Sequence, residues 1–158
     1  MDKSVISEGK RVALLVEGVT TLVGLLLDAL TRNNFEHEVV QAHDRVDRVE
    51  ALDYLLGRGD YTGRDTSTMP CLILLDASLP GGDGLEVLRE IRIHKQTHLL
   101  PVVVFSSSEE EQDEANECYY TLGANSYLGK TCEHEPLVET LRQAAEYWCV
   151  LNEPPPAL

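Results

Sequence analysis

Four polar residues of this sequence have side chains that could together carry out phosphoryl transfer. Each of them lies at or near the end of a short strand-like run: Glu17, Asp76, Ser106 and Lys130. A carboxylate can attack phosphorus to give an acyl phosphate, and an ammonium group and a hydroxyl can bind the phosphoryl oxygens. A second carboxylate suits Mg²⁺, which offsets the negative charge of the transferred group.

The apolar runs before these residues have the length and composition of strands. The three strongest lie at Val12–Val16, Cys71–Leu75 and Pro101–Phe105, and they are typical of parallel strands buried on both faces. Weaker strands are predicted at Glu38–Ala42 and Ser126–Leu128.

Helical patterns separate the strands, because apolar residues recur three and four positions apart. One pattern includes Leu22, Leu26 and Leu30, and another helix is predicted at Val46–Leu56. Alternating strands and helices predict an α/β fold with five βα units, a doubly wound parallel sheet and a long last helix. Ligands of such sheets bind beyond the carboxyl ends of the strands, so the four polar residues should converge at one edge.

Length and composition predict the class of protein. The chain has 158 residues and a formal net charge of −14, which indicates one domain, at 1–152, before a proline-rich tail at 153–158. Strong negative charge disfavours binding to nucleic acid. The apolar runs are too short to span a membrane and the N-terminus lacks a signal-peptide pattern, so we expect a cytoplasmic protein.

Three other features have two interpretations each. The four cysteines form no Cys-x-x-Cys pair and are expected to be reduced, with a structural zinc site as the alternative: Cys71, Cys118, Cys132 and Cys149. The polar segment Gly57–Met69 is either a solvated connection or a binding loop. His94 and His98 are either exposed polar residues or a metal pair on one helix face.

Four motifs in order and spacing resemble the response-regulator receiver family. They are Leu-Leu-Val-Glu at 14–17, Leu-Ile-Leu-Leu-Asp-Ala-Ser-Leu-Pro-Gly-Gly-Asp-Gly-Leu at 72–85, Pro-Val-Val-Val-Phe-Ser-Ser at 101–107 and Gly-Ala-Asn-Ser-Tyr-Leu-Gly-Lys at 123–130. The resemblance implies a flavodoxin-like sheet with strand order 2-1-3-4-5. It also implies a phosphoacceptor that catalyses its own phosphorylation and dephosphorylation, with a sensor histidine kinase as the donor.

The same resemblance implies a role for each matching residue. Asp76 is the phosphoacceptor, Ser106 and Lys130 contact the phosphoryl group, and Tyr127 moves with Ser106 as a switch. Mg²⁺ is implied as the cofactor, with the carboxylates of Glu17 and Asp76 and the backbone carbonyl of Ser78 as its ligands.

Two further segments resemble single-domain regulators of cyanobacterial phytochromes and bacteriophytochromes. They are Gly57–Tyr61 and Tyr147–Pro156, and they imply a phytochrome-type kinase as partner. Since no effector domain follows Asn152, we expect output through protein–protein contacts, with a role as a phosphate sink as the alternative.

The chain departs from the family pattern at two positions. Gly18 stands where a second acidic residue is usual, which predicts weaker Mg²⁺ binding. Thr131 replaces the proline usual after the lysine and argues against a cis peptide bond there. Because Gly18 removes a metal carboxylate, the alternative to a phosphoacceptor is a non-phosphorylated pseudo-receiver that only binds proteins. A flavin or nucleotide carrier on the same fold is less favoured, because no phosphate-binding loop is present.

A heptad-like stripe marks the last helix. Its residues are spaced by alternating steps of four and three: Leu137, Leu141, Ala144, Trp148 and Leu151. Half of this stripe should pack on the sheet, and its C-terminal end should stay exposed. We therefore predict a homodimer through Leu141, Trp148 and Leu151.

Overall fold

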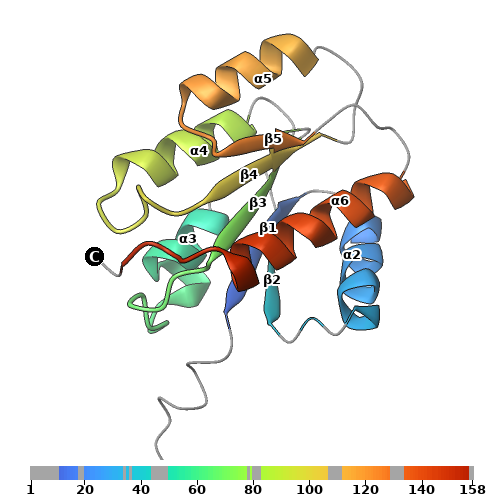
Figure 1. Cartoon of the computed structure of the whole chain (residues 1–158). Coiled ribbons are helices and arrows are strands. Elements are labelled where there is room, and N and C mark those ends of the chain that lie inside the picture. The colour runs from blue at the N-terminus through green and yellow to red at the C-terminus, as the bar shows by residue number, and fades with distance from the viewer. Residues whose placement is uncertain are drawn as a thin grey trace, which may run out of the picture.

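A parallel five-stranded sheet forms the centre of the molecule (Figure 1). The computed structural model describes residues 11–17, 20–33, 35, 37–43, 50–77, 79, 83–106, 112–128 and 134–156. Strand order is β2-β1-β3-β4-β5, which confirms the predicted flavodoxin-like fold. The strands lie within one residue of their predicted ends: β1 (Val12–Glu17), β2 (Glu38–His43), β3 (Leu72–Asp76), β4 (Val102–Phe105) and β5 (Ser126–Leu128).

Helices cover both faces of the sheet. Figure 1 shows α2 (Thr20–Arg32) and α6 (His134–Glu146) on one face. The opposite face carries α3 (Glu50–Leu56), α4 (Asp83–Ile93) and α5 (Gln112–Thr121). The first residues of the helix predicted at 46–56 lie outside the described residues, and its remainder is confirmed as α3.

The two apolar cores explain why the central strands read as continuous apolar runs. All five residues of β3 are buried. Ile73 and Leu75 pack with α3, α4 and α5, whereas Leu72 and Leu74 pack with α2 and α6. Successive side chains of a strand point to opposite faces, so a strand covered on both faces is apolar along its length, as β3 is up to Asp76 at its end.

The long segment between α3 and β3 is ordered by one arginine. After a 3₁₀ turn at Gly59–Tyr61, the Arg64 guanidinium donates hydrogen bonds of 2.5–3.3 Å to four backbone carbonyl oxygens, those of Tyr54, Leu55, Asp65 and Thr68. The guanidinium carbon also lies 4.2 Å from the centroid of the Tyr54 ring. Arg64 thus ties this segment to the last turn of α3.

The last helix departs from the predicted stripe at its C-terminal end. Leu137 and Leu141 pack on the sheet as expected, with Leu141 0% exposed. Beyond them the buried residues are Ala145 and Cys149, four apart, and Leu151 is 76% exposed. A straight helix drifts away from a 3.5-residue repeat, and the chain here widens into a π-helix at Tyr147–Leu151.

Two of the cysteines are joined by a disulfide, Cys71 to Cys149. The expectation that all four are reduced is therefore wrong for this pair. The two residues are 78 positions apart in the sequence, and no spacing rule predicts their contact. The fold brings them together because α6 and its π-helical end run back across the sheet to the start of β3. Cys118 is free and exposed.

Candidate functional site

The carboxyl ends of β1, β3 and β4 meet at one edge of the sheet. Val16 pairs with Leu75, so the next residues along these strands, Glu17 and Asp76, end neighbouring strands. Asp76 in turn pairs with Phe105, which directly precedes Ser106. The backbone therefore brings three of the predicted site positions to one edge. The side chain of Glu17, and all of Ser78 and Lys130, lie outside the part of the chain that the structure describes.

Asp76 and Ser106 are buried polar residues at this edge. Asp76 is 2% exposed and Ser106 is 4% exposed. The Ala77 N–H donates to the Phe105 carbonyl oxygen at 2.7 Å, and the Ser106 N–H donates to the Leu128 carbonyl oxygen at 2.9 Å. These bonds extend the sheet ladder past the strand ends and fix the backbone of both residues.

Tyr127 joins Ser106 to the outer strand and to helix α5. A hydrogen bond connects the side chains of Ser106 and Tyr127. The Tyr127 ring centroid lies 5.9 Å from that of Tyr119, which is buried on α5. The Tyr127 N–H donates to the Tyr120 hydroxyl at 3.2 Å. Adjacent tyrosines of α5 therefore contact both the ring and the backbone of Tyr127.

The negative charge of Asp76 affects the pKa values of Tyr119 and Tyr127. Burial raises the pKa of Tyr119 well above its usual range, and electrostatic interactions with the Tyr127 phenol and the Asp76 carboxylate raise it further. Burial also raises the pKa of Tyr127; its hydrogen bond with Ser106 opposes this, and Asp76 adds to it. Both phenols stay neutral at physiological pH and act here as hydrogen-bonding and packing groups.

Close packing around Asp76 requires a glycine at position 84. A Cβ atom on Gly84 would lie 2.2 Å from the Tyr119 hydroxyl oxygen and 3.1 Å from the Asp76 carbonyl oxygen. Sequence reasoning missed Gly84, Tyr119 and Tyr120 as parts of the site. The spacing of Ala115, Tyr119 and Leu122, four and three apart, was the available signal that Tyr119 faces inward.

Comparison with known families decides the class of protein. The response regulator receiver domain matches residues 14–142. The chain belongs to the response regulator receiver domain family.

Individual relatives of this receiver domain match nearly its whole length. The response regulator Rcp1 of Synechocystis sp. is 32% identical over 142 residues, which are 90% of this chain and 91% of Rcp1. A crystal structure of the phosphorylated cyanobacterial phytochrome response regulator RcpA is 34% identical with a TM-score of 0.77, covering 92% of this chain and 99% of RcpA. The bacteriophytochrome response regulator RtBRR is 40% identical with a TM-score of 0.68, covering 92% and 84%.

The donor chemistry of this receiver domain fits a hard divalent cation. Receiver domains generally bind Mg²⁺, which prefers carboxylate and carbonyl oxygens. The buried Asp76 carboxylate provides such oxygens, and its charge raises the pKa of two neighbouring phenols. A cation beside Asp76 would offset this charge, so the residues present fit the ion.

The two other metal sites considered, a zinc site formed by cysteines and a metal pair of His94 and His98, find no support among the described residues. Cys71 and Cys149 are bonded to each other, and no three His, Cys, Asp or Glu side chains of the described part gather in a metal-binding arrangement. His94 Nε2 lies 3.2 Å from Glu90 Oε2, and His98 Nδ1 lies 2.9 Å from the Lys95 carbonyl oxygen. Likewise, no described helix combines the length and hydrophobicity of a membrane span.

Proposed function

We propose that this receiver domain is a phosphoacceptor switch, in which a sensor histidine kinase transfers a phosphoryl group to Asp76. The observation that carries the proposal is the buried Asp76 carboxylate at the carboxyl end of β3, next to the buried Ser106. Phosphoryl acceptance is the general function of the family to which the chain belongs.

The transfer is a nucleophilic substitution at phosphorus. A carboxylate oxygen of Asp76 attacks the phosphorus of a phosphohistidine, a P–O bond forms, and the P–N bond breaks with its electron pair going to the imidazole nitrogen. Ser106 donates a hydrogen bond to one phosphoryl oxygen, and the Lys130 ammonium pairs with another. Later attack by water returns the Asp76 carboxylate and releases inorganic phosphate.

Glu17, Asp76 and the Ser78 carbonyl oxygen are the proposed ligands of Mg²⁺. When bound, the ion offsets the repulsion between the carboxylate and the phosphoryl oxygens. A Mn²⁺-bound form of the relative Rcp1 supports a divalent site in this part of the family. Gly18 contributes no carboxylate, so we expect weaker Mg²⁺ binding than with an acidic residue there.

Ser106 couples the proposed phosphorylation to the outer part of the sheet. Its hydroxyl is hydrogen-bonded to Tyr127, and a phosphoryl oxygen on Asp76 would compete for that hydroxyl. Loss of the bond allows Tyr127 to move, together with the α5 tyrosines that contact it. The output is a changed protein-binding surface on β5 and α5.

We further propose a phytochrome-type histidine kinase as partner and the cytoplasm as the location. Support comes from RcpA, named as a phytochrome response regulator, and from RtBRR, named as a bacteriophytochrome response regulator.

A homodimer through the end of the last helix is proposed as well. Leu141 is excluded from that contact because it is fully buried in its own chain; the exposed apolar residues there are Tyr147, Val150 and Leu151, next to Trp148.

Labelling from a small phosphodonor such as acetyl phosphate tests the assignment of Asp76. We expect Mg²⁺-dependent phosphate incorporation into the wild type, its loss in Asp76→Asn, and its retention in Asp60→Asn, a matched control on the exposed 3₁₀ turn. Incorporation into Asp76→Asn at the wild-type rate would contradict the assignment.

The pseudo-receiver is the second candidate, and Gly18 is the observation that favours it. A pseudo-receiver takes no phosphate from a small donor or from its kinase. It also shows no Mg²⁺-dependent change in tyrosine fluorescence with beryllofluoride, whereas a phosphoacceptor does, because Tyr127 lies beside Ser106.

A further inference from the structure

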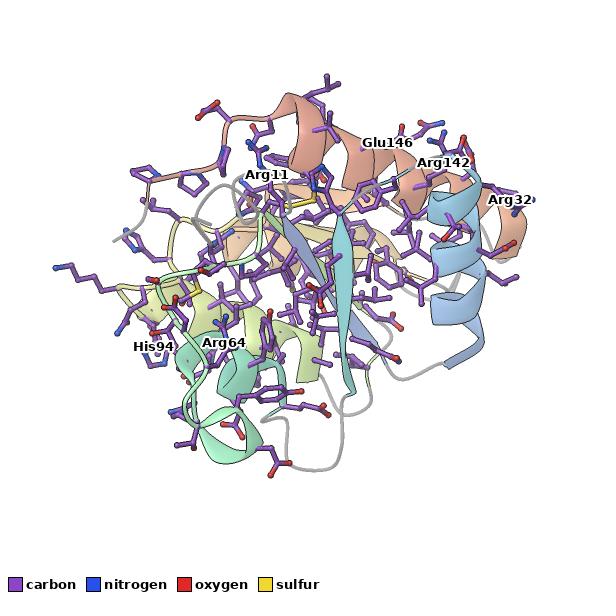
Figure 2. All side chains as sticks on the ribbon, turned by 90° about the horizontal axis from the view of Figure 1, so that it is seen from below. Arg11, Arg32, Arg64, His94, Arg142 and Glu146 are labelled. Atoms are coloured by element: carbon purple, nitrogen blue, oxygen red, sulfur yellow. A yellow bond between two sulfur atoms is a disulfide. The ribbon has the colours of Figure 1, made fainter. Side chains whose placement is uncertain are left out.

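The disulfide between Cys71 and Cys149 attaches the C-terminal segment, residues 147–156, to the sheet. Cys71 directly precedes β3 and Cys149 lies in the π-helix that follows α6. Their Cα atoms are 5.5 Å apart, within the usual range for disulfides. Figure 2 shows this bond in yellow in the interior, beside Arg11. Cys71 is 4% exposed and Cys149 is 1% exposed.

A second, non-covalent attachment holds the same segment. Arg11 Nη1 donates hydrogen bonds to the carbonyl oxygens of Cys149 at 2.9 Å and of Asn152 at 3.2 Å. The Cys71 N–H donates to the Val12 carbonyl oxygen at 2.8 Å, so the start of β3 is fixed beside Arg11. With the disulfide broken, Arg11 therefore keeps the two cysteines near each other, which favours closing the bond again.

The attached segment forms one wall of a cavity at the amino ends of the strands. The cavity measures about 290 Å³ and lies between the Thr66–Pro70 loop, Leu99 and the prolines at 154–156. The π-helix carrying Cys149 also displays Val150 and Leu151, which are 55% and 76% exposed. The disulfide at Cys149 therefore limits the movement of the cavity wall and of the exposed Val150 and Leu151.

We infer that Cys71 and Cys149 form a reversible redox site that exchanges with small-molecule disulfides such as glutathione disulfide. One cysteine thiolate attacks a glutathione sulfur, a mixed disulfide forms, and the first glutathione leaves as a thiolate that takes up a proton. The second cysteine then attacks the mixed disulfide and releases the second glutathione. Two protein thiols are oxidised to one disulfide while one glutathione disulfide is reduced to two thiols.

The exchange requires the C-terminal segment to lift, because both sulfurs are buried. Oxidation therefore fixes residues 147–156 against the sheet, and reduction leaves them held by Arg11 and by the packing of Trp148 on the core. The cytosol keeps most thiols reduced, and disulfides that form there are mainly transient or redox-sensing. The inference stands apart from the phosphoryl chemistry of Asp76, which ends β3, while Cys71 precedes it.

The test uses the full chain with Cys118→Ser and Cys132→Ser, which leaves this pair as its only thiols. The protein is equilibrated in mixtures of reduced and oxidised glutathione, quenched with acid and measured by intact mass spectrometry. We expect the form with an internal disulfide, which is two hydrogens lighter than the reduced form, to be more abundant than the mixed glutathione adducts. Amide hydrogen exchange of the peptide covering 147–152 should be on the order of tenfold slower in the oxidised form, while a peptide from α4 is unchanged.

Two additional variants are matched controls, Cys149→Ser and Cys71→Ser in the same background. Neither can close the internal bond, so their C-terminal exchange should be the same under oxidising and reducing conditions. Circular dichroism shows which of the two variants is folded, and a folded variant is used for the comparison. The inference is overturned if excess glutathione disulfide yields only thiols or mixed adducts, or if the internal disulfide forms without slowing exchange at 147–152.

Discussion

At the scale of single residues, the carboxyl edge of the sheet depends on close packing around Asp76. The Asp76 and Ser106 side chains are buried, and the ring of Tyr119 fills the space between Tyr127 and the start of α4. Such packing leaves little room for an added atom, since protein interiors are as dense as organic crystals. Gly84 is the position where this constraint is tightest.

We expect Gly84→Ala to destabilise the protein by about 1–3 kcal/mol, the usual effect of overpacking. The added Cβ would lie 2.2 Å from the Tyr119 hydroxyl oxygen, so the tyrosine must move. The double variant Gly84→Ala/Tyr119→Phe should recover most of this loss, because it removes the closest atom. Urea unfolding curves of the three proteins measure both effects.

Gly24→Ala is the matched control for this substitution. No atom lies within 4 Å of a Cβ built at Gly24, which is exposed in α2. Alanine there should stabilise the protein by about 0.5–1 kcal/mol through helix propensity. A double variant as unstable as Gly84→Ala would show that the hydroxyl of Tyr119 is not the source of the conflict.

The sequence identified residues of this edge where chemistry and strand position coincide. Asp76 and Ser106 were predicted because a polar residue after a buried apolar run must lie at a strand end. Tyr119 was not predicted, because it has no place in the motifs that carry the chemistry, although its spacing from Ala115 and Leu122 is that of a residue on the inner face of a helix. The packing of α5 on the sheet places Tyr119 in the interior and Tyr120 at the surface.

At the scale of elements, prediction was accurate where burial on both faces dictated the sequence. The apolar runs of β1, β3 and β4 ended within one residue of the observed strands. The last helix was less predictable, because its heptad-like spacing continues past Glu146 while the backbone changes to a π-helix at Tyr147–Leu151. That change places Cys149 inside and Leu151 outside, and no local residue pattern indicates it.

The segment between α3 and β3 shows how one side chain can order an entire connection. Arg64→Ala should lower the free energy of unfolding by about 2 kcal/mol, because charge-assisted hydrogen bonds to four carbonyl oxygens are lost, two at the end of α3 and two in the segment that follows it. Thermal unfolding measures the change. Proteolysis within Gly57–Met69 should also become faster, since the segment loses its attachment to Tyr54 and Leu55.

Arg58→Ala is the control for this arginine. Arg58 is half exposed, and its Nε lies 3.7 Å from Asp53 Oδ1, so its removal should change stability by less than about 0.5 kcal/mol. Equal effects of the two substitutions would mean that Arg64 acts only through its charge and that its carbonyl contacts contribute little.

At the scale of the whole molecule, the two ends of the strands carry different properties. The carboxyl ends hold Asp76 and Ser106, whereas the amino ends hold the cavity and the C-terminal segment. The chain carries a formal net charge of −14, which opposes contacts between copies unless an apolar surface offsets the repulsion. The exposed Tyr147, Val150 and Leu151 form the apolar surface to which we assign the proposed homodimer.

Leu151→Asp should convert the proposed homodimer to a monomer, because it places a charge among the exposed apolar residues of the proposed contact. Leu151 suits the test better than Trp148, since Leu151 is 76% exposed while Trp148 packs on its own core. Light scattering on a sizing column measures the mass.

Ile93→Asp is the control: Ile93 is 66% exposed at the end of α4, away from the C-terminal segment, and its replacement should leave the mass unchanged. If Leu151→Asp keeps the mass of a dimeric wild type, or if the wild type is already monomeric, the last helix is not a dimer contact. The phosphoacceptor proposal is unaffected by either result, because Asp76 and Ser106 lie at the other end of the strands and are buried within a single chain.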